Sequence, residues 1–282
     1  MITIFTRNFG TSGVPRSIFS KFNKYVVSNS SKEFEVVKLI KPVGLIDPPS
    51  KSTKYKEGNS LKDMLDPEKT EKRSEELGLE FNRSGMYDMY TFRKTNGKLF
   101  EAPQSYWKDN KALYFPHVIG RSLVGRINQN IEDSLKGKIS IVKIFTNPVA
   151  EKMTDSFTKN EELDVDYANK DFEKLKDWNS QIVEINLIDS KAKEIIFKLF
   201  GMSKLRKLVP SFLHKNYFLS LRTQIPFTVR EQLMINNMYT GYVMIVDPNL
   251  KIRWIACGNA TEEDFKTLWK SVRGIKRENE TS

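Results

Sequence analysis

Cysteine and histidine are scarce in this chain of 282 residues. Its one cysteine is Cys257, and its two histidines are His117 and His214. A single thiol can form no internal disulfide and cannot supply the paired ligands of a cysteine-based zinc site. A metal centre would have to rest on carboxylates, and no clustered set of Asp and Glu stands out. The sequence therefore predicts neither a metal ion nor a cofactor.

Motifs for nucleotide binding and for nucleophilic catalysis are also missing. Gly120, Gly125 and Gly137 are scattered, and the chain has no G-x-x-x-x-G-K-[ST] loop that could hold phosphates. Ser-His-Asp combinations can be drawn through His117 or His214, but no nucleophile elbow accompanies them, so we interpret them as chance pairings. The sequence thus predicts no catalytic residue of these classes.

Acidic residues are absent from the first 32 positions. This segment holds five basic residues and many Ser and Thr, and it supplies +5 of the net charge of +11. An Arg-containing, Ser-rich, acid-free N-terminus is typical of a mitochondrial transit peptide, to which we assign residues 1–35. A disordered basic tail is the alternative. The segment has no uninterrupted apolar run of about 7–15 residues, as a secretory signal requires.

Long hydrophobic runs are missing as well. No stretch approaches the roughly 20 apolar residues of a membrane-spanning helix, so we expect a soluble or peripheral protein. The charge that remains outside the N-terminal segment, +6, is far below the density of a nucleic-acid-binding domain.

Residues 36–110 read as an N-terminal extension. Pro42, Pro48 and Pro49 favour extended chain near its start. A polar helix is expected over residues 60–79. The aromatic-rich stretch 86–92, followed by Asn96 and Gly97, is predicted to be a strand or hairpin arm because the Asn-Gly pair suits a tight turn.

The C-terminal half alternates buried strands with amphipathic helices. Apolar runs at 139–145, 182–188 and 242–246 predict strands covered on both faces. A turn at 247–250 leads to an alternating strand at 251–257. Apolar stripes predict helices near 192–200 and 265–272, the second capped by Thr261 and ending at Gly274, before a polar tail at 276–282.

This order of elements predicts an α/β fold: a thioredoxin-like mixed sheet flanked by helices, over residues 111–275, behind a long, partly irregular N-terminal extension. A thiol oxidoreductase of this fold needs a thiolate at the first strand-to-helix turn and a second thiol nearby. Here that turn reads FTNPVA (145–150), and MYTG (238–241) stands where these enzymes place a cis-proline. The sequence therefore favours a binding or chaperone role without enzymatic activity.

Cys257 is the one thiol that could contradict this interpretation. We place it at the end of an edge hairpin, on one face with Arg253 and Ile255, while Ile252 and Trp254 take the other face. A small, half-buried structural residue is expected there. The alternative function is a thiol oxidoreductase or peroxidase that uses Cys257.

One acid-free segment interleaves cations with apolar and aromatic side chains, between Ile195 and Arg230. Such a segment can lie on an anionic membrane surface or against a partner protein. The alternative is a core stripe with a solvated basic rim, and RNA binding would require exposed aromatics among the cations. The candidate interaction residues are Lys198, Lys204, Arg206, Lys207, Lys215 and Arg222.

Two motifs carry a family resemblance: ALYFPHVIGRSL (112–123), and YTGYV (239–243) with IRWIACGNAT (252–261). Together they resemble a fungal family of mitochondrial assembly factors for the Fo sector of ATP synthase, over roughly residues 40–275. The resemblance implies a chaperone that binds subunit a (subunit 6) and acts as a peripheral protein on the matrix side of the inner membrane. It implies no nucleic acid, no small-molecule substrate and no catalytic residues.

Overall fold

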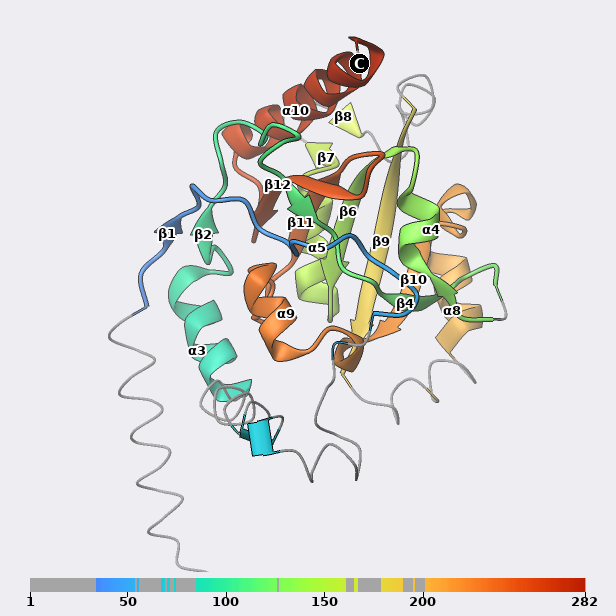
Figure 1. Ribbon diagram of the computed structural model, residues 1–282. Coiled ribbons are helices and arrows are strands. Elements are labelled where there is room, and N and C mark those ends of the chain that lie inside the picture. The colour runs from blue at the N-terminus through green and yellow to red at the C-terminus, as the bar shows by residue number, and fades with distance from the viewer. Residues whose placement is uncertain are drawn as a thin grey trace, which may run out of the picture.

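The computed structural model describes residues 34–53, 55, 67–68, 70–71, 74, 85–125, 127–160, 165–166, 179–189, 195 and 201–281. Figure 1 shows a central sheet with helices on both of its faces and the C-terminal helix across one end. The expected transit peptide lies almost wholly outside the described residues. So does the helix expected near 192–200, except for Ile195, which is helical and exposed.

Four strands form the centre of the sheet: β6 (Ile139–Phe145), β9 (Ser180–Ile188), β11 (Tyr242–Val246) and β12 (Lys251–Cys257). Their order is β9-β6-β11-β12. β6 and β9 are parallel, whereas β11 runs antiparallel to both β6 and β12. This is the thioredoxin arrangement, so the predicted fold class and all four predicted strands are confirmed.

Shorter strands extend the sheet on both sides to the order β3-β12-β11-β6-β9-β10-β4-β5. They are β3 (Leu113–Tyr114), β10 (Tyr217–Leu221), β4 (Ile119–Ser122) and β5 (Gln129–Asn130). Two small pairs lie outside it: β1 (Val37–Lys38) with β2 (Phe100–Glu101), and β7 (Lys159–Asn160) with β8 (Val165–Asp166).

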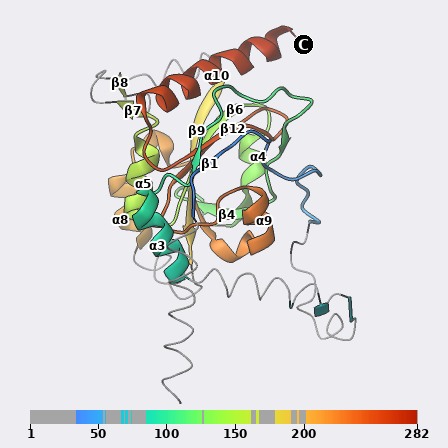
Figure 2. The same cartoon turned by 90° about the vertical axis from the view of Figure 1, so that its left-hand side faces the viewer.

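Alternation along the strands sends side chains to the two faces of the sheet, where they join separate hydrophobic clusters. On β6, Val142 and Ile144 pack in one cluster with residues of α4 (Ile131–Leu135) and α9 (Phe227–Gln232). Ile139 and Ile141 join Trp269 of α10 (Glu262–Thr281) in another. Figure 2 shows α4 and α9 on one side of the sheet, and α5 (Pro148–Asp155) with α8 (Met202–Leu208) on the other. Strands buried on both faces explain the continuous apolar runs of the sequence.

The prediction of a strand or hairpin arm at 86–92 is wrong, because residues 85–95 form the helix α3 (Gly85–Thr95). Asn96 and Gly97 end this helix with positive φ angles of 51° and 82°, and the Gly97 N–H donates to the carbonyl of Phe92. An Asn-Gly pair suits a helix C-terminus as well as a hairpin turn, since both require left-handed backbone. Aromatic residues favour strands only through their packing context, which here is helical.

The last helix begins as predicted but does not end at Gly274. Thr261 and Asp264 cap it reciprocally, each side chain accepting from the other's backbone N–H. Gly274 lies inside the helix. A glycine is needed at this position because the ring of Tyr106 packs against it, and an added Cβ would come within 2.7 Å of that ring. Residues 276–281, expected as a polar tail, continue α10.

Two 3-10 turns flank β10, at Ser211–Leu213 and Arg222–Gln224. Of the polar helix expected over 60–79, the described residues are Pro67, Glu68, Thr70, Glu71 and Ser74, all helical and exposed.

Candidate binding site at the thiol-free turn

The turn between β6 and α5 is closed by its own side chains. The Asn147 Oδ1 accepts from the backbone N–H groups of Val149 and Ala150, at 3.0 Å each, so it occupies donors that would otherwise stabilise a thiolate. The Asn147 Nδ2 donates to the carbonyl of Met238 over 2.9 Å, and the Thr146 hydroxyl donates to the same carbonyl. The turn thus keeps its position in the fold without any group for thiol chemistry.

The facing segment also departs from a redox site. No peptide bond of the described residues is cis, and residue 241 is a glycine. A Cβ added to Gly241 would lie 2.2 Å from the carbonyl oxygen of Ala150, so α5 packs directly on this backbone. The sequence has no proline here, and the close contact with α5 requires a residue without a Cβ at position 241.

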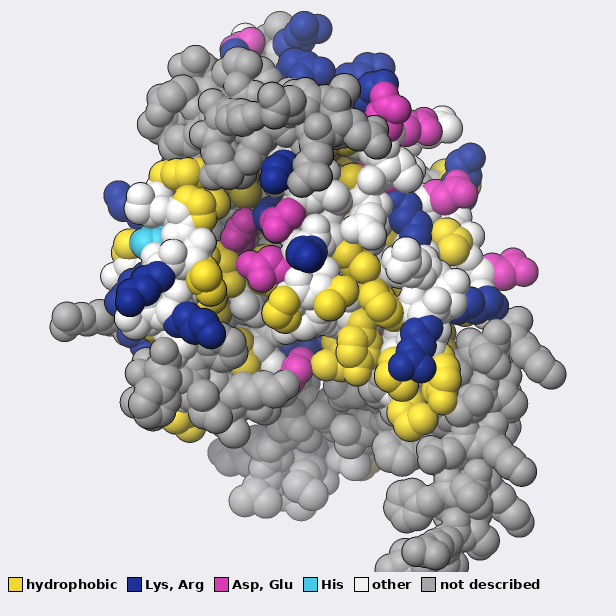
Figure 3. Space-filling model, turned by 180° about the vertical axis from the view of Figure 1, so that it is seen from behind, with side chains coloured by type: hydrophobic (Ala, Val, Ile, Leu, Met, Phe, Trp, Pro, Cys, Tyr) yellow, Lys and Arg dark blue, Asp and Glu magenta, His cyan; other side chains and the backbone are white. Residues whose placement is uncertain are grey.

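A pocket of about 410 Å³ opens beside this turn, between α5, the end of β9 and α8. Most of its wall is apolar, and a few polar groups converge on it. Figure 3 views this face of the molecule, where acidic side chains gather near the centre with hydrophobic ones beside them. Its lining includes Pro148, Glu151, Asn186, Ile188, Asp189, Lys204, Leu205, Leu208 and Tyr217.

Glu151 is the unusual group of this pocket. It is half-buried, and among the described residues its carboxylate makes no ion pair and no hydrogen bond. Burial, together with the nearby charges of Glu184 and Asp155, raises the pKa of Glu151 to about 7. A partly buried carboxyl with a shifted pKa in a pocket is a recognised mark of a functional site.

Lys143 lies beneath the same helix. Its side chain is 3% exposed, and its Nζ is 2.5 Å from the Asp155 Oδ1 and 2.6 Å from the Glu184 Oε1. Burial alone would lower the pKa of Lys143, but Glu184 and then Asp155 raise it by more, so the ammonium is retained. One cation therefore faces three carboxylates, counting Glu151, and negative charge is in excess on this side of the pocket.

This buried charged group was not predicted from the sequence. The available signal was a lysine and a glutamate inside two mostly apolar strands, Lys143 in β6 and Glu184 in β9, because charged residues are seldom fully buried unless paired. They are register partners across the parallel pair.

Cys257 is buried rather than half-buried. Its Sγ accepts from the Leu99 N–H at 3.2 Å and contacts the carbonyl of Phe100 at 3.6 Å, so β12 is covered here and is not an exposed edge. A register shift in β12 also corrects the expected faces, because Ile252 packs in the same cluster as Ile255 and Cys257. Burial raises the pKa of the Cys257 thiol to about 11.

We predict that Cys257→Ser keeps full function and that the native thiol is inert. At about pH 8 only about one thiol in a thousand is ionised when its pKa is about 11. The measurement is the rate of labelling by a thiol reagent, which should be slow in the native protein and fast in guanidinium. Fast native labelling, or loss of activity in a folded Cys257→Ser protein, would contradict this.

The candidate basic residues do not share one role. Lys204, Lys207 and Lys215 are exposed and make no ion pair with any described residue. The Arg206 Nε donates to the carbonyl of Leu123 over 2.7 Å, and the half-buried Arg222 donates to the carbonyl of Asn236 over 2.6 Å. Lys198 lies outside the described residues.

Part of the segment's apolar content is core, as the alternative interpretation held. Tyr217 and Phe218 lie in β10 and are fully buried, so they cannot stack on RNA bases. Leu208, in contrast, is 69% exposed. The bond from Arg206 also brings the β4–β5 loop to α8, where Val124 and Ile127 are 54% and 81% exposed. Exposed cations and apolar side chains thus occur together around α8.

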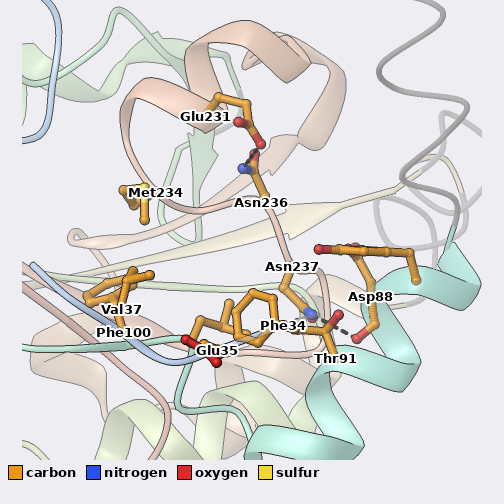
Figure 4. A pocket seen from close by; sticks show the side chains of 12 residues that line it. Phe34, Glu35, Val37, Asp88, Thr91, Phe100, Glu231, Met234, Asn236 and Asn237 are labelled. Carbon is orange, nitrogen blue, oxygen red and sulfur yellow. Dashed lines mark hydrogen bonds between the residues drawn. The ribbon is translucent and has the colours of Figure 1, made fainter. Parts of the chain in front are cut away.

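A second, smaller pocket of about 240 Å³ lies against α3. Figure 4 shows Asp88, Thr91 and Asn237 close together in its wall. The Asn237 Nδ2 donates to the Asp88 carbonyl at 2.7 Å, and the Asp88 carboxylate accepts from the Met238 N–H at 3.0 Å. These groups fasten α3 to the segment that precedes β11, so we assign them a structural role.

The described residues contain no group of three or more His, Cys, Asp or Glu side chains placed to hold a metal ion. None of the described helices combines the length and the apolar character needed to cross a bilayer.

The sequence and the fold are similar to those of known proteins. The chain is 48% identical over 264 residues to "Mitochondrial ATPase complex subunit ATP10" of Candida glabrata, with 93% of each chain covered. It is 44% identical to the protein of the same name from Saccharomyces cerevisiae, covering 92% of this chain and 94% of the relative. A solved thiol:disulfide interchange protein from Bacteroides sp. is 18% identical, with a TM-score of 0.38 over 58% of this chain and 90% of that one. The model of the family described as "ATP10 protein" matches residues 23–275, and the chain belongs to that family.

Proposed function

We propose that the protein is a non-enzymatic assembly factor of the mitochondrial ATPase complex, and that it acts as a chaperone for subunit a (subunit 6) of the Fo sector. The observation that carries the proposal is the thiol-free turn. Asn147 caps α5 where a redox enzyme needs a thiolate, so the fold keeps its pocket but has no redox chemistry there. The yeast relatives are named as subunits of the ATPase complex.

The place of action that we propose is the matrix side of the inner membrane, to which the protein would bind peripherally. Support comes from the exposed Lys207 and Lys215 and the exposed apolar side chains around α8. Apolar side chains can enter the headgroup region while neighbouring cations attract anionic lipids.

A thiol oxidoreductase or peroxidase using Cys257 is the rival function. It would require an accessible thiol with a lowered pKa, whereas this thiol is buried and its pKa is raised. RNA binding would require exposed aromatic side chains, whereas the aromatic residues of β10 are buried.

Deletion of residues 1–32 is expected to leave the protein in the cytosol. These residues carry five cations and no acidic group, as import signals do. The measurement is fractionation of cells that express the truncated chain, with the full chain as the control. Matrix delivery of the truncated form at the normal level would refute the assignment.

The proposed client is tested by crosslinking in isolated mitochondria during synthesis of subunit a, followed by affinity purification and mass spectrometry. We expect adducts with newly made subunit a that disappear once it has joined the complex. Recovery of the protein without subunit a, under conditions that capture other transient complexes, would reject this client.

A further inference from the structure

We propose that the pocket between α5 and α8 binds an apolar peptide segment that carries a lysine or arginine, and that the cation of this segment pairs with Glu151. The inference rests on the proposed function, and it names the part of the protein that holds the client. It also states which chemistry the client segment must have.

The wall of the pocket suits an apolar chain. Ile188 and Tyr217 form a buried part of it, and Leu205 is half-buried. Leu208 at the pocket and Val149 next to Pro148 are exposed, so apolar surface continues beyond the opening. The volume of about 410 Å³ lies in the range of about 300–1,000 Å³ that is usual for ligand sites. It can accept a few side chains of an extended or helical segment.

The charge around the pocket favours a cation. Glu151 has no partner among the described residues, and Lys143 is already engaged by Asp155 and Glu184. Tyr217 stays neutral because burial raises its pKa far above neutrality. An incoming cation would pair with Glu151 and offset the repulsion from the other two carboxylates.

An anionic ligand fits less well. The start of α5 would attract an anion, but the side chain of Asn147 already occupies the N–H groups of Val149 and Ala150. Lys204 is the one cation among the described lining residues, and it is exposed and makes no ion pair with Glu151. Asp189 adds a further acidic side chain to the lining.

Binding of a labelled, leucine-rich peptide with one central lysine to the full chain tests the proposal, with norleucine in place of the lysine as the comparison. At about pH 8 we expect the lysine peptide to bind about tenfold more tightly, because a charge-assisted hydrogen bond in a desolvated site has about that effect. Glu151→Gln should remove this preference and leave the norleucine peptide unaffected.

The pH dependence is an independent readout. Glu151 is ionised above its pKa of about 7 and protonated below it, so the preference for lysine should fall between about pH 8 and pH 6. The matched control is Glu263→Gln, in the exposed first turn of α10, which should behave as the parent. Glu151→Gln should melt no lower than the parent at pH 8, because it removes an unpaired charge from a half-buried site.

Equal binding of the two peptides by the parent, or an unchanged preference in a folded Glu151→Gln protein, overturns the inference. A photocrosslinker at Leu208 in mitochondria separates this failure from that of the proposed function. We expect adducts with subunit a that Glu151→Gln reduces. If subunit a still co-purifies with the protein but no adduct forms at Leu208, the function stands and the pocket is wrong. If subunit a never co-purifies, the proposed function itself has failed.

Discussion

Replacement of Arg253 by methionine is expected to lower the free energy of unfolding by about 3–5 kcal/mol. The Arg253 side chain is 1% exposed and lies 3.1 Å from the equally buried Asp247 carboxylate and 2.5 Å from that of Glu278. Its Nε donates to the carbonyl of Trp107 over 2.7 Å. Methionine fills a similar volume but leaves the Asp247 charge buried without its partner.

The second substitution Asp247→Asn should recover part of this loss, since it removes the stranded charge. The amide oxygen can still accept from the Asn249 and Lys251 N–H groups of the turn, as the carboxylate does now. Urea unfolding followed by tryptophan fluorescence gives the free energy of unfolding of all variants. The control is Lys266→Ala, which removes an exposed ion pair with Glu262 on α10. A loss below about 1 kcal/mol in Arg253→Met would show that this network does not hold the hairpin and α10 together.

Reversal of Lys207 and Lys215 to glutamate is expected to weaken membrane association by more than about 30-fold. Each cation near anionic headgroups contributes about 1 kcal/mol, so neutralising two already corresponds to about 2 kcal/mol, or about 30-fold, and reversal adds repulsion. We choose these two lysines because both are exposed and neither makes an ion pair with a described residue. Arg206 is avoided because it also holds the β4–β5 loop.

Flotation with liposomes that contain anionic lipid, together with salt-graded release from mitochondrial membranes, gives the measurement. Reversal of Lys108 and Lys111, both exposed, changes the net charge equally and should have a much smaller effect. A thermal melt checks that the folds are intact, because surface changes usually cost within about 0.5 kcal/mol. Equal flotation of the two double variants would mean that binding follows net charge and not this surface.

Tertiary contacts decide which residues of the acid-free segment are exposed and which are buried, and the composition of the segment does not show this. Lys207 and Arg222 look alike in the sequence, yet one is exposed and the other is half-buried on the carbonyl of Asn236. Likewise Leu208 is exposed whereas Phe218 is buried in β10. Which cations are available for a surface depends on strand and helix positions set by residues far away in the chain.

The helix α3 gives a second case. Its aromatic residues and the following Asn-Gly pair are locally compatible with either a hairpin or a helix. The choice is made by long-range hydrogen bonds, because the Asp88 carbonyl and carboxylate bind Asn237 and Met238 about 150 residues later in the chain. Local preference is weak when two conformations satisfy the same turn residues, so tertiary contacts decide.

The sequence by itself determined the four central strands, the thioredoxin-like order and the lack of a thiol at the turn. Strands buried on both faces are mostly apolar, so their runs stand out in the sequence, and the absence of cysteine at the turn is a property of the sequence itself. Only the tertiary structure decided that Lys143 pairs with Glu184 beneath α5, that Glu151 of α5 lies near this pair, and that Cys257 is buried. Burial and pKa depend on neighbours that the fold brings together from distant positions in the chain.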